Sequence, residues 1–397
     1  MAKLRTLFTA AVLLGAVFGI LADPAGAFRS SLAGLRLWWD VVFPAMFPFL
    51  TLAELLNAGG ILKAAGAWFE PMTRRMLGLP GIGAAVVWLG VSAGQPAAAT
   101  LVAKLVDERR IDGRQAERLL AVSHLAHPVF IVSVVGANLF QDVRIGWLLA
   151  IVHYTTAIFT AVLFIRPTLK AEVPVARSPT DGPPSSFGAR HAGRLQERPP
   201  SFGRLLGDAV ASTVARLFAV GGWMMFFSVT VEMIRKAVSA AAEVASWRSG
   251  DEASVWIPVL FDHCLGAAAA AGADGPLRWQ TAVASFALAW GGLSGHAQAF
   301  AMVAGRGVRY WPFSAVRAVH AVLSAATAFA VAGLVPIGTY PASPASTAGS
   351  QHVDRFRPNV GDISVWSEIP DMLVASLITA ALIATAALTA RANFRPR

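Results

Sequence analysis

Charged residues and cysteine are both scarce in this sequence. Asp, Glu, Lys and Arg make up only 14% of the 397 residues, whereas hydrophobic residues make up 55% and the mean hydropathy is +0.57. A soluble domain of this length would carry far more charge on its surface. The single cysteine, Cys264, excludes an intramolecular disulfide and a cysteine-based metal cage. The composition therefore predicts a membrane protein.

Recognisable catalytic motifs are lacking as well. No nucleotide-binding loop is present, and the stretch Gly292-Leu293-Ser294-Gly295 lacks the spacing of the G-x-S-x-G nucleophile elbow. We therefore expect a protein that is neither an enzyme nor an ATP-driven pump, and that uses no cofactor and no metal.

Long apolar stretches take the place of charge. Most of them approach the roughly 20 residues that a helix needs to cross a bilayer. They cover residues 6–22, 41–53, 81–103, 119–139, 145–165, 215–231, 279–304, 311–337 and 372–390. This pattern predicts an all-α, polytopic transmembrane bundle of about 8–10 membrane segments, with the lipid bilayer of the cell membrane as its partner.

The net charge of +10 does not indicate a nucleic-acid partner. The basic residues gather in short loops and tails between apolar runs, which is the distribution that the positive-inside rule produces. Residues 166–204 contain seven Lys or Arg, three Asp or Glu and seven prolines, so this stretch reads as a flexible cytoplasmic linker. The two termini are also basic, and we expect them on the cytoplasmic side.

The linker divides the chain into two membrane halves. Residues 1–30 form an N-terminal anchor helix, for which a cleaved signal peptide ending near Ala25-Gly26-Ala27 is the less favoured alternative. Residues 31–165 form the first membrane repeat and residues 205–337 the second. A loop at 338–368 and a C-terminal membrane helix with a basic tail at 369–397 complete the chain.

One apolar run is interrupted at its centre by Gly94-Gln95-Pro96. Proline removes a backbone donor and disfavours helix at the residue before it, and glycine permits a turn. Five apolar runs precede the linker, which is an odd number for a half with both ends on one side. A re-entrant hairpin or broken helix at Gly94 restores the parity, whereas a kinked continuous helix is the alternative.

The second half resembles the first as an internal repeat. The stretch "FLTLAELL" at 49–56 aligns on "FSVTVEMI" at 227–234 and pairs Glu54 with Glu232. "SAGQPAAA" at 92–99 has a counterpart in "LSGHAQAF" at 293–300, where Gly295 interrupts the apolar run. Duplicated halves with interrupted helices at corresponding positions are typical of the binding sites of secondary transporters. The sequence leaves open whether the repeat is parallel or inverted.

Two acids lie inside apolar runs, Glu54 and Glu232. A charge at the centre of a membrane helix costs roughly 2.5–3.5 kcal/mol on insertion scales, so each needs a cavity, a partner or a proton. One interpretation is solute binding or ion coupling. The other is structural, with each acid capping a hairpin or pairing with an arginine such as Arg118 or Arg317.

His124 and His127 are spaced one helical turn apart, which predicts both imidazoles on one helix face. Metal ligands and proton relays use such spacing, but no accompanying metal motif is present, so hydrogen bonding inside the bundle is the better interpretation. The candidate substrate-binding residues are Glu54, Ser92, Gly94, Gln95, Pro96, His124, His127, Glu232, Ser294, Gly295, His296 and Gln298.

Three stretches carry a resemblance to a known family. They are "VVFPAMFPFLTLAELL" at 41–56, the segment 92–130 that begins "SAGQPAAATLVAKL", and the segment 290–323 that begins "WGGLSGHAQAF". Together they resemble the sporulation integral membrane proteins of the YlbJ type, within the nucleoside-recognition or gate-domain group. The resemblance implies a polytopic membrane protein needed for endospore development. Because the wider group includes parts of nucleoside and ferrous-iron transporters, it also implies passage of a solute.

The chain departs from the family pattern at candidate ligand positions. Gln95 stands where the family has tyrosine, Ala98 replaces a second glycine, and residues 124–128 replace a polar turn rich in small residues. The substrate of a relative cannot be carried over for that reason. The expected function is a permease-like transporter of a small polar solute, nucleoside-like or ionic, and the alternative is a non-transporting structural or assembly protein of sporulation. The sequence leaves the oligomeric state open, a homo-oligomer included.

Overall fold

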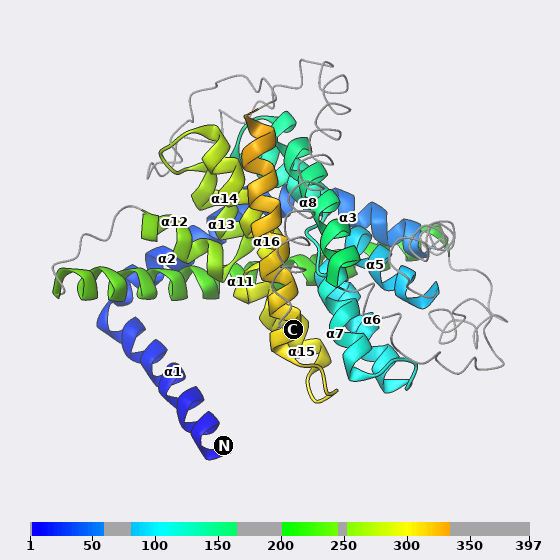
Figure 1. Cartoon of the computed structure of the whole chain (residues 1–397), viewed down its shortest axis with the longest axis horizontal. Helices are drawn as coiled ribbons and strands as arrows, with labels where there is room; N and C mark the ends of the chain where they lie inside the picture. Colours follow the sequence, from blue (N-terminus) through cyan, green and yellow to red (C-terminus); the bar gives the residue numbers. More distant parts are fainter. Residues whose placement is uncertain (1, 59–80, 165–200, 245–251, 334–397) are drawn as a thin grey trace, which may run out of the picture.

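The structure is a computed structural model that describes residues 2–58, 81–164, 201–244 and 252–333 (Figure 1). These residues are almost entirely helical and contain no strand, which confirms the predicted all-α fold. The elements are α1 (Ala2–Ala22), α2 (Pro24–Leu37), η1 (Trp38–Val42), α3 (Phe43–Ala58), α5 (Gly81–Ala93), α6 (Gln95–Asp107), α7 (Gly113–Ser123), η2 (Phe130–Leu139), α8 (Val143–Phe164), α11 (Phe202–Val244), α12 (Glu252–Phe261), α13 (His263–Ala271), α14 (Leu277–Trp290), α15 (Gly292–Val303) and α16 (Tyr310–Ala332). The predicted loop at 338–368, the C-terminal segment and nearly all of the linker lie outside the described residues.

Four helices in the described part of the chain are long and apolar enough to cross a membrane. They are Pro24–Leu56, Val143–Phe164, Phe202–Glu243 and Tyr310–Ala332. Several other apolar helices are shorter, and some occur as pairs joined end to end. The chain is thus a multi-pass helical membrane protein.

Helix α11 is too long for a simple crossing. At about 1.5 Å per residue its 43 residues extend roughly 65 Å, about twice the hydrocarbon thickness of a bilayer. It packs along α2 and α3 and crosses the α8 and α16 direction in Figure 1. Trp38 fixes this packing, because its indole N–H donates to the Leu217 carbonyl at 2.9 Å and its ring fills the space beside Gly221.

Besides the α1–α2 junction at Asp23, four helices are interrupted in the described part of the chain. The breaks lie at Gly94 between α5 and α6, at residues 124–127 between α7 and η2, at Asp262 between α12 and α13, and at Gly291 between α14 and α15. Gly94 has φ +83° and Gly291 has φ +85°, values that favour glycine. The second predicted break is therefore displaced, because Gly295 lies inside α15 and the interruption itself falls at Gly291.

The apolar interior consists of two separate clusters. The larger joins η1, α3, η2, α11, α12, α13 and α14, together with the first half of α8 and the last turn of α16. The smaller joins α5, α6, α7, the end of α8, α15 and the beginning of α16. Two of the breaks, at residues 124–127 and at Gly291, lie where the chain passes from one cluster to the other.

Candidate functional site

The interrupted helices of the two halves meet at Gln95. A Cβ placed on Gly295 would lie 2.8 Å from Gln95 Oε1, and a Cβ on Gly291 would lie 3.7 Å from Gln95 Nε2. Helices α6 and α15 also pack against each other beyond this point. The residue that follows the first break therefore contacts the backbone of the second, so the two interruptions form one central region.

His124 closes this region from a third helix. Its Nε2 would be 2.6 Å from a Cβ on Gly291, so only a glycine leaves room for the ring. The side chain is 1% exposed, and neither ring nitrogen has a hydrogen-bond partner among the described residues. Its ring packs on Phe313 and on His296, with ring centroids 5.2 and 5.5 Å away. Nε2 therefore lies against the second break, and both buried nitrogens are without a hydrogen-bond partner in the described part of the chain.

His296 is held by hydrogen bonds of its own. Its Nε2 lies 2.9 Å from the carbonyl oxygen of Trp290 and its Nδ1 lies 3.1 Å from the Tyr310 hydroxyl. The Trp290 carbonyl belongs to the last turn of α14, just before the break. His296 therefore binds a helix end and fixes the geometry of the α14–α15 interruption.

Asp262 organises the fourth interruption. Its Oδ1 accepts from the backbone N–H groups of Cys264 at 2.8 Å and Leu265 at 3.1 Å, so it caps the N-terminus of α13. Its Oδ2 accepts from the Ser294 hydroxyl at 2.5 Å. The backbone of Asp262 also packs on Gly292, where a Cβ would lie 2.6 Å from the Asp262 Cα. This buried carboxylate connects the α12–α13 break to the α14–α15 break.

Arg317 is a fully buried cation on α16 beside the breaks. Its Nη1 donates to the Ala121 carbonyl at 3.4 Å and its Nη2 donates to the Ala289 carbonyl, and these oxygens lie in the last turns of α7 and α14. The side chain is 1% exposed, and its Nε has no partner among the described residues. No ion pair connects it to a described acidic side chain. Helix C-termini carry partial negative charge, which offsets part of the guanidinium charge.

The predicted shared helix face of His124 and His127 is wrong. Residues 124–127 are not helical, because Pro128 disfavours helix in the residue before it. His127 points elsewhere: its Nδ1 accepts from the Val129 N–H at 3.1 Å, so its Nε2 carries the proton and donates to the Ser92 carbonyl at 3.1 Å. That carbonyl lies in the last turn of α5, two residues before Gly94. His127 therefore binds the first interruption and His124 faces the second.

A curated protein is closely related in sequence. The chain is 32% identical over 336 residues to the "Sporulation integral membrane protein YlbJ" of Bacillus subtilis (strain 168), and the match covers 82% of each chain. The chain belongs to the YlbJ family of sporulation integral membrane proteins. No protein-family model matches it, and no solved structure matches it either.

The two acids that this YlbJ-family member carries in apolar runs both form ion pairs. Glu54 on α3 pairs with Arg216 on α11, with side chains 20% and 30% exposed. Glu232 on α11 accepts from Arg235 Nε at 2.9 Å, and Lys236 Nζ lies 3.6 Å from it. The pairing with arginine expected under the structural interpretation is present, but the partners are Arg216 and Arg235, whereas Arg317 binds helix carbonyls.

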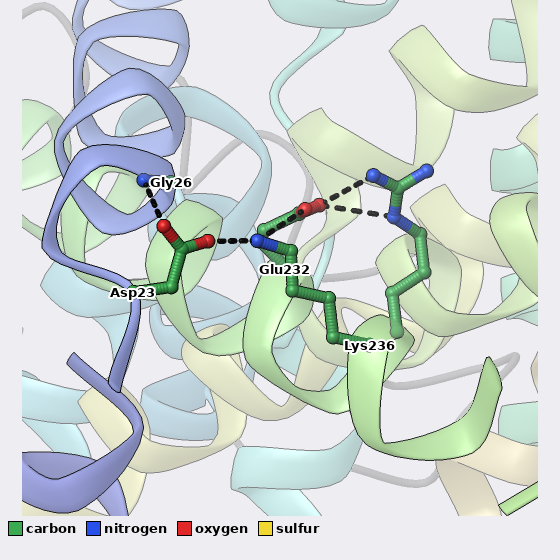
Figure 2. Close-up of polar contacts among 5 residues, drawn as sticks. Asp23, Gly26, Glu232 and Lys236 are labelled. Atoms are coloured by element: carbon green, nitrogen blue, oxygen red, sulfur yellow. Dashed lines mark hydrogen bonds and ion pairs between the residues drawn. The ribbon is translucent and has the colours of Figure 1, made fainter. Parts of the chain in front are cut away.

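Glu232 belongs to a cluster at the junction of α1 and α2 (Figure 2). Lys236 lies between Glu232 and Asp23 and forms an ion pair with each. Asp23 also caps α2, because its Oδ1 accepts from the Gly26 N–H at 2.8 Å. None of these partners belongs to the four interruptions. The ion-pair partners of Glu232 are thus different residues from those that surround Gln95.

The remaining predicted residues are close to the breaks in sequence but differ in role. Pro96 occupies the first turn of α6, where its missing N–H costs nothing, and Gln298 is half-buried on α15. The hydroxyl of Ser92 donates to the Trp88 carbonyl at 2.8 Å within its own helix. Among the described residues, no group of three or more His, Cys, Asp or Glu is placed to hold a metal ion.

Three residues of the central region were missing from the predicted set, namely Gly291, Asp262 and Arg317. Each carries a signal that the sequence displays: Gly291-Gly292 is a double glycine after an apolar run, Asp262 precedes an Ala-rich helix as an N-cap would, and Arg317 is a charge inside an apolar run. Their convergence depends on long-range packing, which these local signals do not specify.

Proposed function

We propose that this YlbJ-family protein is a permease-like membrane transporter of a small polar solute that acts in endospore formation. The sporulation role rests on the name and similarity of the Bacillus subtilis relative. The transport role is supported by the convergence of broken helices at Gln95, because half-helix ends expose backbone groups that bind solutes near the membrane midplane.

The two kinds of half-helix end differ in their hydrogen bonding, and this difference indicates the chemical class of the solute. The C-terminal ends of the half-helices already have donors: His127 binds the last turn of α5, His296 that of α14, and Arg317 those of α7 and α14. The N-terminal ends of α6 and α15 follow glycines and have no side-chain cap among the residues that the structure describes. A solute there finds donors rather than acceptors.

The charges around these N-termini favour an anion. Helix N-termini carry partial positive charge, and the buried guanidinium of Arg317 adds a full one nearby. Asp262 adds a negative charge beside Ser294, which opposes this preference, and its carboxylate already accepts three hydrogen bonds from its own helix and from Ser294. We therefore infer a solute with a carboxylate or a similar anionic group that contacts the Gln95 amide, the Ser294 backbone and His124.

An internal repeat fits this proposal. Under it, the α5–α6 interruption in the first half corresponds to the α14–α15 interruption in the second, and both act as half-crossing elements around the shared solute site. In the predicted re-entrant hairpin, the α5–α6 element enters the membrane, turns at Gly94 and leaves on the side from which it entered. Labelling single cysteines at Ala85 and Glu108, near the two ends of the α5–α6 element, from each side of the membrane tests it, since a re-entrant element returns both ends to one side.

Flux and binding measurements test the transport role. Purified protein in liposomes is offered radiolabelled succinate, glutamate or uridine. We expect uptake of at least one of the anions and no uptake of uridine, together with loss of uptake in Gln95→Ala. Arg114→Gln, which changes an exposed charge on α7 away from the breaks, serves as the matched control and should retain uptake. Uridine uptake would support a neutral, nucleoside-like solute instead.

A non-transporting structural protein of sporulation is the second candidate. It is favoured by the ion pairs of Glu54 and Glu232, which satisfy both acids within the protein. It predicts that Gln95→Ala supports normal yields of heat-resistant spores in a Bacillus subtilis strain whose own relative has been deleted. The transport role predicts that this variant fails although the protein is present in the membrane.

A further inference from the structure

The smaller apolar cluster forms a body of its own. It contains buried side chains from α6 and α7 of the first half and from α15 and α16 of the second, among them Val102, Leu120, Val303 and Phe313. We call α5, α6, α7, α15 and the first turns of α16 the small body, and the elements of the larger cluster the large body. Residues far apart in the chain thus share one core.

Two ion pairs clamp the small body at its outer end. Arg306 binds Asp107 through two bonds of 2.8 Å, and Arg309 Nε lies 2.7 Å from Glu117 Oε1. The loop after α15 also touches the loop after α6, because a Cβ on Gly113 would lie 2.7 Å from the Gly307 carbonyl oxygen. Separation of α6 from α15 would therefore break an apolar core, both ion pairs and this close backbone contact.

The two bodies are joined by the hydrogen bonds of Asp262 to Ser294 and of His127 to Ser92, and by two chain crossings that are not helical. The chain crosses from α14 to α15 through Gly291 and Gly292, which have φ +85° and +69°. It crosses from α7 to η2 through the non-helical residues 124–127. These segments have no continuous helical hydrogen bonding, so they bend at lower cost than a helix does. Of the described helices, α8 and α16 are the ones that pass unbroken along both bodies.

Arg317 lies on α16 at this boundary and binds next to both hinges. Its two carbonyl partners, Ala121 and Ala289, end the helices that lead into residues 124–127 and into Gly291. One belongs to the small body and the other adjoins the large body. A solute anion that draws the guanidinium away from either carbonyl would loosen the bond between the bodies.

We propose that the small body moves as one rigid unit against the large body, with hinges at residues 124–127 and at Gly291-Gly292 and with α8 and α16 bending where they pass from one body to the other. The inference rests on the proposed function, because a fixed scaffold has no need of such a motion. The ion pairs of Asp107 and Glu117 then hold the small body together and do not act as a gate that opens between α6 and α15.

Spin-label distances test the motion without any solute. In a Cys264→Ser background, labels at Arg114 and Ala301 report within the small body, and labels at Ser212 and Leu260 report within the large body as the matched control. Labels at Arg114 and Ser212 report across the boundary. All four residues are exposed, and each lies on a helix that belongs to one of the two bodies. We expect one narrow distance for each internal pair and a broad or two-peaked distribution for the pair across the boundary, in nanodiscs at 25 °C.

A narrow single distance across the boundary would overturn the proposal, and so would a split distribution for Arg114 and Ala301. These results are independent of transport. Protein that fails in the flux assay yet gives two distances across the boundary would remove the proposed function and retain the hinged body. Protein that transports but gives a single distance for every pair would retain the proposed function and remove the hinged body.

Discussion

The side chain of Gln95 lies against the backbone of Gly295, and this contact joins the two halves of the chain at their helix breaks. A Cβ on Gly295 would lie 2.8 Å from Gln95 Oε1 and 3.3 Å from His124 Nε2. Because Gln95 follows Gly94 directly, its position depends on the first break. The absence of a side chain at residue 295 therefore sets how closely α6 approaches α15.

Two glycine substitutions should differ sharply in their cost. Gly292→Ala would press a Cβ on the Asp262 backbone and strain a residue with φ +69°, so we expect the free energy of unfolding to fall by about 2–4 kcal/mol. Gly295→Ala meets the flexible amide end of Gln95 at 2.8 Å and the edge of the His124 ring at 3.3 Å, but no backbone atom, so we expect a loss below about 1.5 kcal/mol. SDS-induced unfolding in mixed micelles measures both. Gly222→Ala, which meets no atom within 4 Å, is the control and should not destabilise.

Removal of the Asp262 carboxylate should destabilise more than removal of an ordinary helix cap. Asp262→Ala leaves Ser294 and two backbone N–H groups without their acceptor in a buried place, so we expect a loss of about 2–4 kcal/mol. Asp112→Ala is the matched control, since Asp112 caps α7 at an exposed site and should cost about 1 kcal/mol. Equal losses for the two variants would show that Asp262 is only a cap.

The fold class and one of the breaks were predictable because their causes are local. Hydrophobic run length reports directly on membrane helices, and Gly94 followed by Gln95-Pro96 has few helical alternatives. The break at 124–127 was also signalled locally, by Pro128, but the spacing of the two histidines suggested a helix instead. Helical spacing does not predict which side chains share a face where the backbone is not helical.

The partners of the buried charges could not be predicted in the same way. Glu54 pairs with Arg216, which is 162 positions away, and Arg317 binds carbonyls of α7 and α14. Such pairs depend on how α3, α11 and α16 pack, and a single sequence contains no signal for that packing. Sequence reasoning identified the need for a partner correctly and could not identify which residue it was.

The Glu54–Arg216 pair should behave as a structural unit. Glu54→Gln alone leaves a half-buried guanidinium without its acid, so we expect a loss of about 1–3 kcal/mol. Glu54→Gln combined with Arg216→Gln should recover most of that loss, because two amides can hydrogen-bond to each other. Stability in mixed micelles and heat-resistant spore yield are measured together. A stable double variant that produces no such spores would instead assign Glu54 to solute handling.

The two ion pairs of the outer loops should differ in stability and in their response to acid. Glu117 is 4% exposed and accepts three hydrogen bonds from Arg309, so Glu117→Gln should cost about 1–3 kcal/mol, whereas Asp107, 55% exposed, should tolerate Asn with little change.

The Arg306 guanidinium holds the pKa of Asp107 below its usual 3.8. A lowered folded pKa gives a contribution that is fully present above about pH 4 and is lost as the pH falls below that value. The mobility of a spin label at Ala304 should therefore stay constant from pH 7 to pH 5 and rise in stronger acid, and this acid step should disappear in Asp107→Asn.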